Sequence, residues 1–369
     1  MCNHFLPLEE ALEKRKQTGI LRTLRNRKEG VDFYSNDYLG FAKNKTFLNL
    51  LLKTVQENPE LLKGSTGSRL ISGNTSVVTE TEEFIAKEHQ YEAALLFSSG
   101  YNANLALFAS LPGRHDTVIV DEKIHRSVHD GCKMSNAKKI KFRHNDCGHL
   151  ESILKRQNGT VYIAVESLYS MDGDFCPLKE IADLAVKYNA ALIVDEAHAF
   201  GVFGYGLVHR LSIHEKVLAT VVTYGKALGT HGAAVLTNDI IKSYLINFAS
   251  PFIYTTASHD FLWMSISKGY EFLNENNTAP AQLQKNISIF RKGNIKSPSD
   301  ENSPIQSIII PDNHQLKLLS QTLCDNGFLT YPIFSPTVKE GAERLRICLH
   351  SFNTEEEIVK LTELINEFT

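Results

Sequence analysis

The sequence has no closely spaced pair of cysteines, no long apolar run and no excess of charge of one sign, and each absence excludes a class of protein. Its six cysteines are scattered without a C-x-x-C pair, which argues against a disulfide framework or a zinc ribbon and favours a reducing compartment. A net charge of −3, from 39 basic and 42 acidic residues, gives no electrostatic reason to expect nucleic acid as a partner.

Signals for export or membrane insertion are also missing from the sequence. Residues 1–14 lack a basic start followed by an apolar run, and no stretch elsewhere approaches the length of a membrane span. We therefore expect a cytoplasmic protein without a membrane partner. With 369 residues, 43% of them hydrophobic and 22% charged, the chain is typical of a globular protein of two or three domains.

The clearest pattern that is present is an alternation of apolar, strand-like runs with helical stretches between about residues 45 and 240. This alternation is typical of a parallel sheet that has helices on both faces. The strands that we predict are residues 93–97, 117–120, 161–165, 191–194, 219–223 and 233–236. One basic run, residues 138–143, we interpret as a solvated surface.

The two ends of the chain differ from this α/β pattern. Residues 8 to about 28 are predicted to be helical, and residues 274–304 are polar enough to be a connection into a second, α+β unit. In that unit we expect strands near residues 306–310 and 345–349, and a final helix opened by a capping box at residues 354–357. The predicted division is an N-terminal helix and arm (1–44), a large α/β domain (45–250) and a smaller C-terminal α+β domain (251–369).

Polar residues follow directly after most of the predicted strands. Asp195 and His198 follow one strand, His125 follows another, Ser170 follows a third, and Lys226 lies just past the strand that ends at Thr223. In an open α/β sheet, ligands bind outside the carboxyl ends of the strands, so these side chains should lie at one edge of the sheet. Taken singly, the lysine could be a solvated loop residue, an aspartate a helix cap and a histidine a structural residue.

Taken together, the same residue types indicate one ligand class, pyridoxal 5′-phosphate (PLP). This cofactor needs a lysine for a Schiff base, a carboxylate for its pyridine nitrogen, a flat side chain on its ring and a helix N-terminus for its phosphate. The turn through Gly100 and Tyr101, from a strand into a helix, is the candidate phosphate site, and Thr223 could add a hydroxyl donor.

Other ligand motifs are absent or weak in this sequence. No G-x-x-x-x-G-K-[ST] loop and no strand-embedded G-x-G-x-x-G are present, which excludes the usual nucleotide-binding signatures. His125 with His129, and the cluster His144–His149, have no established ligand spacing, so we expect no metal site.

The chain resembles the α-oxoamine synthase family over almost its whole length. The stretches that carry the resemblance are Ser35–Gly40, Gly64–Arg69, Ser98–Asn104, Ser170–Asp174, Asp195–His198, Thr223–Gly229 and Arg344–Ile347. The resemblance implies an aspartate-aminotransferase-like PLP enzyme of fold type I, with a mostly parallel central sheet and a smaller α+β C-terminal domain. It also implies an acyltransferase that condenses an amino acid with an acyl thioester and releases CO₂.

The resemblance also implies roles for individual residues. Lys226 would form the Schiff base, Asp195 would pair with the pyridine N–H, and His125 would stack on the ring; these three are the expected catalytic residues. The residues that match cofactor-binding positions are Gly100, Tyr101, His125, Ser170, Asp195, His198, Thr223, Lys226, Thr255 and Thr256. The two threonines would reach the partner's phosphate in a homodimer with shared active sites.

For the substrates, the resemblance implies that Asn36 and Arg346 hold the carboxylate of the amino acid, with Arg344 as the competing choice. A distal carboxyl group on the acyl chain would meet Arg22, with Arg25 as the alternative. Residues 232–236 and 170–178 resemble the branch that condenses L-alanine with a pimeloyl thioester, carried by CoA or by acyl carrier protein, to give 8-amino-7-oxononanoate.

Three departures from the family pattern concern the substrate and not the cofactor. Val77–Thr79 occupies the region after Gly73-Asn74 where the family often has a histidine, Ala199 replaces the usual Gly or Ser, and His231 is unusual. Two alternatives therefore stay open. One is a sister activity, such as 2-amino-3-ketobutyrate CoA ligase or serine palmitoyltransferase, and the other is a non-catalytic scaffold subunit, against which the retained Lys226 argues.

Overall fold

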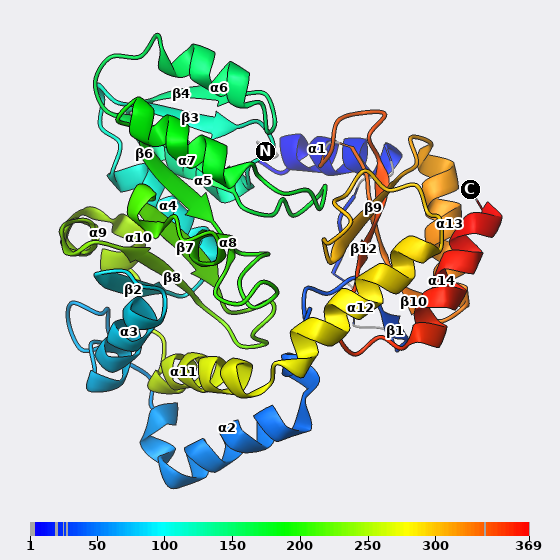
Figure 1. Cartoon of the computed structure of the whole chain (residues 1–369), viewed down its shortest axis with the longest axis horizontal. Helices are drawn as coiled ribbons and strands as arrows, with labels where there is room; N and C mark the ends of the chain where they lie inside the picture. The colour runs from blue at the N-terminus through cyan, green and yellow to red at the C-terminus, as the bar shows by residue number, and fades with distance from the viewer. Residues whose placement is uncertain (1–3, 19–20, 25, 27–28, 336, 369) are drawn as a thin grey trace.

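The computed structural model describes residues 4–18, 21–24, 26, 29–335 and 337–368, and it contains a large α/β unit beside a smaller unit (Figure 1). The large sheet has seven strands in the order β2-β8-β7-β6-β5-β3-β4. Their bounds are β2 (Ala93–Phe97), β3 (Thr117–Asp121), β4 (Lys138–Phe142), β5 (Val161–Glu166), β6 (Ala191–Asp195), β7 (Ala219–Thr223) and β8 (Ala233–Thr237). Only β8 runs antiparallel to its neighbours in this sheet, so the predicted, mostly parallel sheet is confirmed.

The two faces of this sheet pack into different hydrophobic cores. Val118 and Val120 of β3 lie in one core with Leu107, whereas Ile119 lies in another with Ile181. Successive residues of a strand point to opposite faces, so both faces are covered by helices. The helices of this unit are α3 (Ser76–Glu88), α4 (Gly100–Ser110), α5 (Arg126–Met134), α6 (Cys147–Leu154), α7 (Leu178–Lys187), α8 (Leu207–Arg210), α9 (Asp239–Phe248) and α10 (Ser250–Ile253).

Strand β4 was missed by the sequence prediction, which interpreted residues 138–143 as a solvated basic surface. The strand pairs with β3 at one end of the sheet order, so one of its edges has no strand partner in the described sheet. Lys138, Lys139 and Lys141 lie on it, and lysines on an edge strand oppose pairing with another chain. The charge run that suggested a solvated surface is therefore a property of an edge strand.

The smaller unit is built on an antiparallel sheet in the order β11-β12-β9, with a separate parallel pair of β1 and β10. The N-terminal arm thus joins this unit, since β1 belongs to the arm. The bounds are β1 (Val31–Asp32), β9 (Ile305–Ile309), β10 (Phe328–Leu329), β11 (Tyr331–Ile333) and β12 (Arg344–Cys348), with helices α12 (Thr278–Lys292), α13 (Asn313–Asp325) and α14 (Glu355–Phe368).

The capping box expected before the last helix is present. The backbone N–H of Thr354 donates to Glu357 Oε2 at 2.8 Å, and the N–H of Glu357 donates to Thr354 Oγ1 at 3.2 Å. These reciprocal bonds satisfy two of the amide groups that an α-helix leaves unpaired at its start.

Two sequence predictions about helices were wrong. The first helix, α1 (Leu6–Gln17), ends well before residue 28, and the N–H of Thr18 caps it by donating to Lys14 O. Residues 274–304 are not only a connection, because α12 lies within them and buries Leu283, Ile287 and Phe290. The apolar positions recur every three or four residues but are diluted by Gln, Asn and Lys, which hid the helical period.

The helix that follows the predicted division at residue 250 contacts helices of the large unit. Helix α11 (Asp260–Glu275) packs against α3 and α2 (Lys45–Glu57), both at the lower end of the large unit in Figure 1. We therefore propose a boundary near residue 276, where α11 ends. The remaining short turns are η1 (Phe41–Lys43), η2 (Pro59–Leu62) and η3 (His214–Lys216). In the described residues, no helix is long and apolar enough to cross a membrane.

Candidate active site

Lys226 lies on the tight connection between β7 and β8, at the edge of the sheet where the parallel strands end. The turn is closed by the N–H of Tyr224, which donates to Gly232 O at 3.0 Å, and by the N–H of Thr230, which donates to Tyr224 O at 3.0 Å. Gly229 has φ +66°, and a Cβ there would lie 2.3 Å from the backbone N of Ala42. Glycine is therefore required for this turn to pack against the N-terminal arm.

The surroundings of the Lys226 side chain favour its neutral, reactive amine form. Within the described chain it has no hydrogen-bond or ion-pair partner, although the residue is half-buried. Burial lowers the pKa of Lys226 and outweighs the opposing charges of Asp195 and Glu166, while the charge of Arg346 lowers it further. A lysine with a lowered pKa has a larger neutral fraction, which is the nucleophilic and basic form.

Asp195, at the end of β6, is held by two donors. Its Oδ1 accepts the N–H of Ala197 at 2.9 Å, and its Oδ2 accepts Asn104 Nδ2 at 2.7 Å. Asn104 Nδ2 also lies 3.0 Å from Ser127 Oγ, which in turn lies 2.8 Å from His125 Nδ1. The carboxylate and the ring expected to stack on the cofactor are thus joined through two side chains that the sequence analysis missed, Asn104 and Ser127.

The start of α4 is where the sequence predicts the phosphate site. Ser99 caps the helix by accepting the N–H of Asn102 at 3.2 Å, and a Cβ at Gly100 would lie only 2.5 Å from Thr223 Cγ2. The helix N-terminus therefore lies directly against the end of β7. The hydroxyl of Thr223 donates to Ala197 O at 3.3 Å, and the ring of Tyr101 lies edge-on to His125 at 6.4 Å.

Two arginines of β12 point to the same side of their strand but have different partners. Arg346 donates from Nε to Ser170 O at 2.7 Å and from a terminal nitrogen to Asn36 Oδ1 at 3.0 Å. Arg344 donates to Asp172 Oδ1 at 2.7 Å, in an ion pair where its side chain is 7% exposed. The charge of Arg346, not that of Arg344, lowers the pKa of Lys226 and of His198. Arg346 is therefore the arginine whose charge acts on Lys226.

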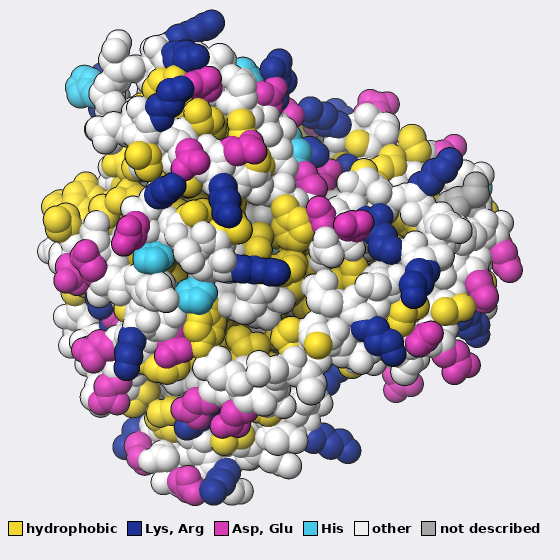
Figure 2. Space-filling view, in the orientation of Figure 1, with side chains coloured by type: hydrophobic (Ala, Val, Ile, Leu, Met, Phe, Trp, Pro, Cys, Tyr) yellow, Lys and Arg dark blue, Asp and Glu magenta, His cyan; other side chains and the backbone are white. Residues whose placement is uncertain are grey.

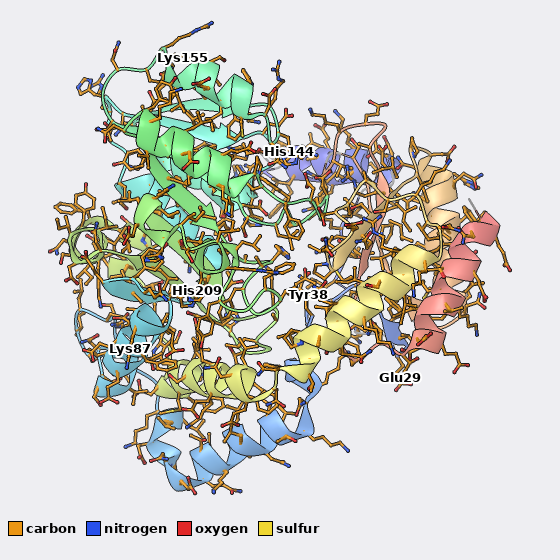
Figure 3. The ribbon with its side chains drawn as sticks, viewed as in Figure 1. Glu29, Tyr38, Lys87, His144, Lys155 and His209 are labelled. Carbon is orange, nitrogen blue, oxygen red and sulfur yellow. The ribbon has the colours of Figure 1, made fainter. Side chains whose placement is uncertain are left out.

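Tyr38 links the two halves of the site, and Figure 3 shows it where the large and small units meet. Its hydroxyl donates to Asn36 Oδ1 at 3.2 Å and lies 2.8 Å from His198 Nδ1. Burial, together with the charges of Lys226 and Arg346, lowers the pKa of His198, so the ring is neutral. Tyr38 was not singled out from the sequence, although it lies only two residues after Asn36.

Some of the expected site residues are not brought to Lys226 within one chain. Thr255 and Thr256 are exposed, and Thr256 forms an isolated bridge with Ser68. Arg22 is exposed and donates to Thr337 Oγ1 at 3.2 Å, and its alternative, Arg25, lies outside the described residues. Among the departures from the family pattern, Ala199 is fully buried and His231 is exposed.

The candidate metal clusters have other partners. His125 takes part in the contacts beside Asp195, and the ring of His144 is paired with Asp121 and Asp174. In the part of the chain that the structure describes, no group of three His, Cys, Asp or Glu side chains is arranged to hold a metal ion. Cys132, Cys147, Cys176 and Cys348 are free thiols.

Known proteins show the same fold and related sequences. The model of the aminotransferase class I and II family matches residues 28–365. The chain is 39% identical to the 8-amino-7-oxononanoate synthase of Emericella nidulans, over 97% of this chain and 94% of that protein. The crystal structure of 8-amino-7-oxononanoate synthase from Francisella tularensis is 30% identical with a TM-score of 0.78, and covers 92% of this chain and 97% of that one.

A second solved structure supports the fold alone. Serine palmitoyltransferase from S. paucimobilis, solved with a bound PLP–myriocin aldimine, has a TM-score of 0.88 at 23% identity, covering 99% of this chain and 97% of that one. The fold is thus that of a PLP-dependent transferase, with a mostly parallel sheet and a smaller α+β unit, as predicted.

The residues at the sheet edge fit PLP as the cofactor. Lys226 offers an unpartnered amine, Asp195 is oriented by two donors, and an 11-residue helix begins at Gly100, against the end of β7. The chain belongs to the class I and II aminotransferase family, and within it this is a PLP-dependent acyltransferase of the α-oxoamine synthase type, close to 8-amino-7-oxononanoate synthase.

Proposed function

We propose that this enzyme condenses L-alanine with a pimeloyl thioester, releasing CO₂ and the thiol, to give 8-amino-7-oxononanoate, a precursor of biotin. The observation that carries the proposal is that the charges of Asp195, at the same sheet edge, and of Arg346, from the small unit, both act on Lys226, in a chain 39% identical to an enzyme of that name. The donor is pimeloyl-CoA or pimeloyl bound to acyl carrier protein. A cytoplasmic location remains a prediction from the sequence.

The cofactor supplies an electron sink when it is bound, and the side chains supply position and protons. Asp195 would pair with the pyridine N–H of the bound cofactor, and His125 would pack against its ring. Lys226 would hold the cofactor and would act as the base that removes the α-proton of the amino acid. Its lowered pKa suits it to both tasks, because a neutral amine is needed for each.

Arg346 and Asn36 are proposed to hold the carboxylate of the amino acid. A guanidinium offers two parallel N–H bonds to a carboxylate, and burial strengthens such a charged pair because water does not compete for it. Arg346 is 6% exposed, and Asn36 Oδ1 already orients it from the N-terminal arm. Fixing the carboxylate sets which bond of the amino acid faces Lys226.

A sister activity is the second candidate, favoured by the likeness in fold to serine palmitoyltransferase. It would use the same cofactor residues and differ in the space left for the amino acid and the acyl chain. A scaffold without activity is disfavoured because an unpartnered, partly buried lysine with a lowered pKa is of no use to a purely structural subunit.

Lys226 should carry the cofactor in the purified protein. Borohydride reduction followed by peptide mapping is expected to place a pyridoxyl group on the peptide that contains Lys226. The Lys226→Ala variant, loaded and reduced in the same way, is the control and should show no label there. A pyridoxyl group on a different lysine of the unmodified protein contradicts the assignment.

Arg346 should matter more than Arg344 for the amino acid. We expect Arg346→Lys to raise the KM for the amino acid roughly 10- to 100-fold, the range of one or two hydrogen bonds to a charged group. Arg344→Lys is the matched control on the same strand, since a lysine can keep the ion pair with Asp172, and its effect should be several-fold smaller. Steady-state kinetics at saturating thioester measures both; a larger effect of Arg344→Lys reverses the assignment.

The enzyme is proposed to be a homodimer in which Thr255 and Thr256 complete the partner's phosphate site. A mixed dimer of Lys226→Ala with Thr255→Ala/Thr256→Ala tests this. If the sites are shared, the one remaining lysine faces intact threonines, and its affinity for PLP should equal that of the unmodified enzyme. Affinity as weak as in the threonine-variant homodimer shows that the threonines act within their own chain.

Substrate choice is measured by thiol release from acetyl, pimeloyl and palmitoyl thioesters, each tested with alanine, glycine and serine. Alanine with the pimeloyl thioester should exceed every other pair by well over tenfold in kcat/KM, which corresponds to about 1.4 kcal/mol of differential transition-state binding. Preference for glycine with acetyl, or for serine with palmitoyl, reassigns the enzyme to a sister activity and leaves the cofactor site unchanged.

A further inference from the structure

The segment that follows β5, residues 168–175, forms a small hairpin between the two units. The N–H of Tyr169 donates to Asp174 O at 3.0 Å, the N–H of Gly173 donates to Tyr169 O at 2.9 Å, and Leu168 forms a bridge with Phe175. The 168–175 hairpin carries Ser170, whose carbonyl orients Arg346. Its position therefore bears directly on the proposed carboxylate site.

The tip of the 168–175 hairpin is docked on the small unit. Met171 O accepts the hydroxyl of Ser307 at 2.6 Å, and Asp172 accepts Arg344 at 2.7 Å. Gly173 has φ +70°, and a Cβ there would lie 2.1 Å from Ile305 O. The tip is thus packed closely against β9 and paired with β12.

The base of the 168–175 hairpin is held by the loop after β4. His144 Nε2 lies 2.5 Å from Asp174 Oδ2, while Nδ1 lies 2.9 Å from Asp121 Oδ1 at the end of β3. Asn145 also connects the hairpin to the end of β3. Its backbone N–H donates to Asp121 Oδ2 at 3.0 Å, and its Nδ2 donates to Asp174 Oδ2 at 3.0 Å and to Phe175 O. Figure 3 shows His144 on the side of the large unit that faces the small one.

The ring of His144 carries a positive charge in this arrangement. Ionised carboxylates only accept hydrogen bonds, so a ring with a carboxylate on each nitrogen donates from both. Burial by itself lowers the pKa of His144, but its bonds to Asp121 and Asp174 outweigh burial and raise it to about 9.

The other groups around His144 do not offset this charge. Glu122 Oε1 accepts the backbone N–H of His144 at 3.4 Å, and the ring of Tyr169 lies edge-on at 4.5 Å. Burial raises the pKa of the nearby Cys176 thiol, so it stays neutral.

We propose that His144 is a positioning residue: by pairing with Asp121 and Asp174 it fastens the 168–175 hairpin to β3, and so places the Ser170 carbonyl that orients Arg346 toward the amino acid. This role deepens the proposed function and rests on it for the identity of the bound carboxylate. It also accounts for the His144–His149 cluster, which the sequence analysis had considered as a metal site.

The sign of the pH effect follows from the raised pKa. The charged ring contributes its full stabilisation below the ordinary imidazole value of 6.5, and the contribution is lost as the pH rises through about 9. The hydrogen bonds of His144 that hold the 168–175 hairpin should therefore weaken as the pH rises from neutral to above 9.

Hydrogen exchange of the PLP-loaded enzyme measures how well the backbone amides of the 168–175 hairpin are protected. His144→Asn and Asp174→Asn should each speed exchange of the Tyr169 and Gly173 amides roughly tenfold, the loss expected from one hydrogen bond between charged groups. His149→Asn is the control, because that ring accepts the N–H of Arg143 and has no bond to the hairpin. Asp174 is 27% exposed, so its conservative replacement is compatible with folding.

The same experiment on the unmodified enzyme needs no variant. After correction for the intrinsic rate, protection of these two amides should fall as the pH rises from 7 through about 9, while β6 amides stay protected. Exchange that matches the His149→Asn control in both variants, or protection that does not change with pH, overturns the proposal.

A second measurement separates positioning from general loss of stability. The apparent Kd of L-alanine, read from the absorbance of the bound cofactor, should rise about tenfold in both variants, and KM should rise more than kcat falls. An equal loss in the His149→Asn control contradicts the role. If the unmodified enzyme binds glycine or serine in place of alanine, the proposed function fails while the exchange experiment still decides the role of His144.

Discussion

The site depends on two buried arginines of one strand that tie the small unit to the large one. Arg344 and Arg346 are 5% and 6% exposed, and a buried guanidinium without partners is strongly unfavourable. Their partners, Asp172, Ser170 O and Asn36, come from the 168–175 hairpin and the N-terminal arm. Figure 2 shows apolar atoms between the two units, with charged side chains around them. The need to satisfy two charges thus fixes how the units meet.

The electrostatics of the site follow from burial at the strand ends. Glu166 and Asp195 stand opposite each other on β5 and β6. Burial raises the pKa of Glu166 well above its usual range, and the charge of Asp195 raises it further. Two carboxylates this close are not both ionised at low cost, so Glu166 holds a proton.

Much of this architecture can be predicted from local patterns. Six strands of the large sheet, the capping box before α14 and the residues after each strand all follow from apolar runs and turn residues that act over a few positions. Strand β4 and helix α12 were missed for the opposite reason. Their charged and amide side chains are tolerated by an edge strand and by the outer face of a packed helix, and no local signal marks either place.

The sequence by itself determined which chemical groups the site has: a lysine, an aspartate and two histidines at the ends of parallel strands, because a βαβ pattern sends all such ends to one edge. Only the tertiary structure decided how those groups are held. Asn104 and Ser127 reach Asp195 and His125 from two different helices, and Tyr38 reaches His198 across 160 residues. Asp172 pairs with Arg344, whereas Ser170 O and Asn36 pair with Arg346. These contacts join residues that are far apart in the chain. Which residues meet depends on how the two units pack, and no local sequence pattern encodes that packing.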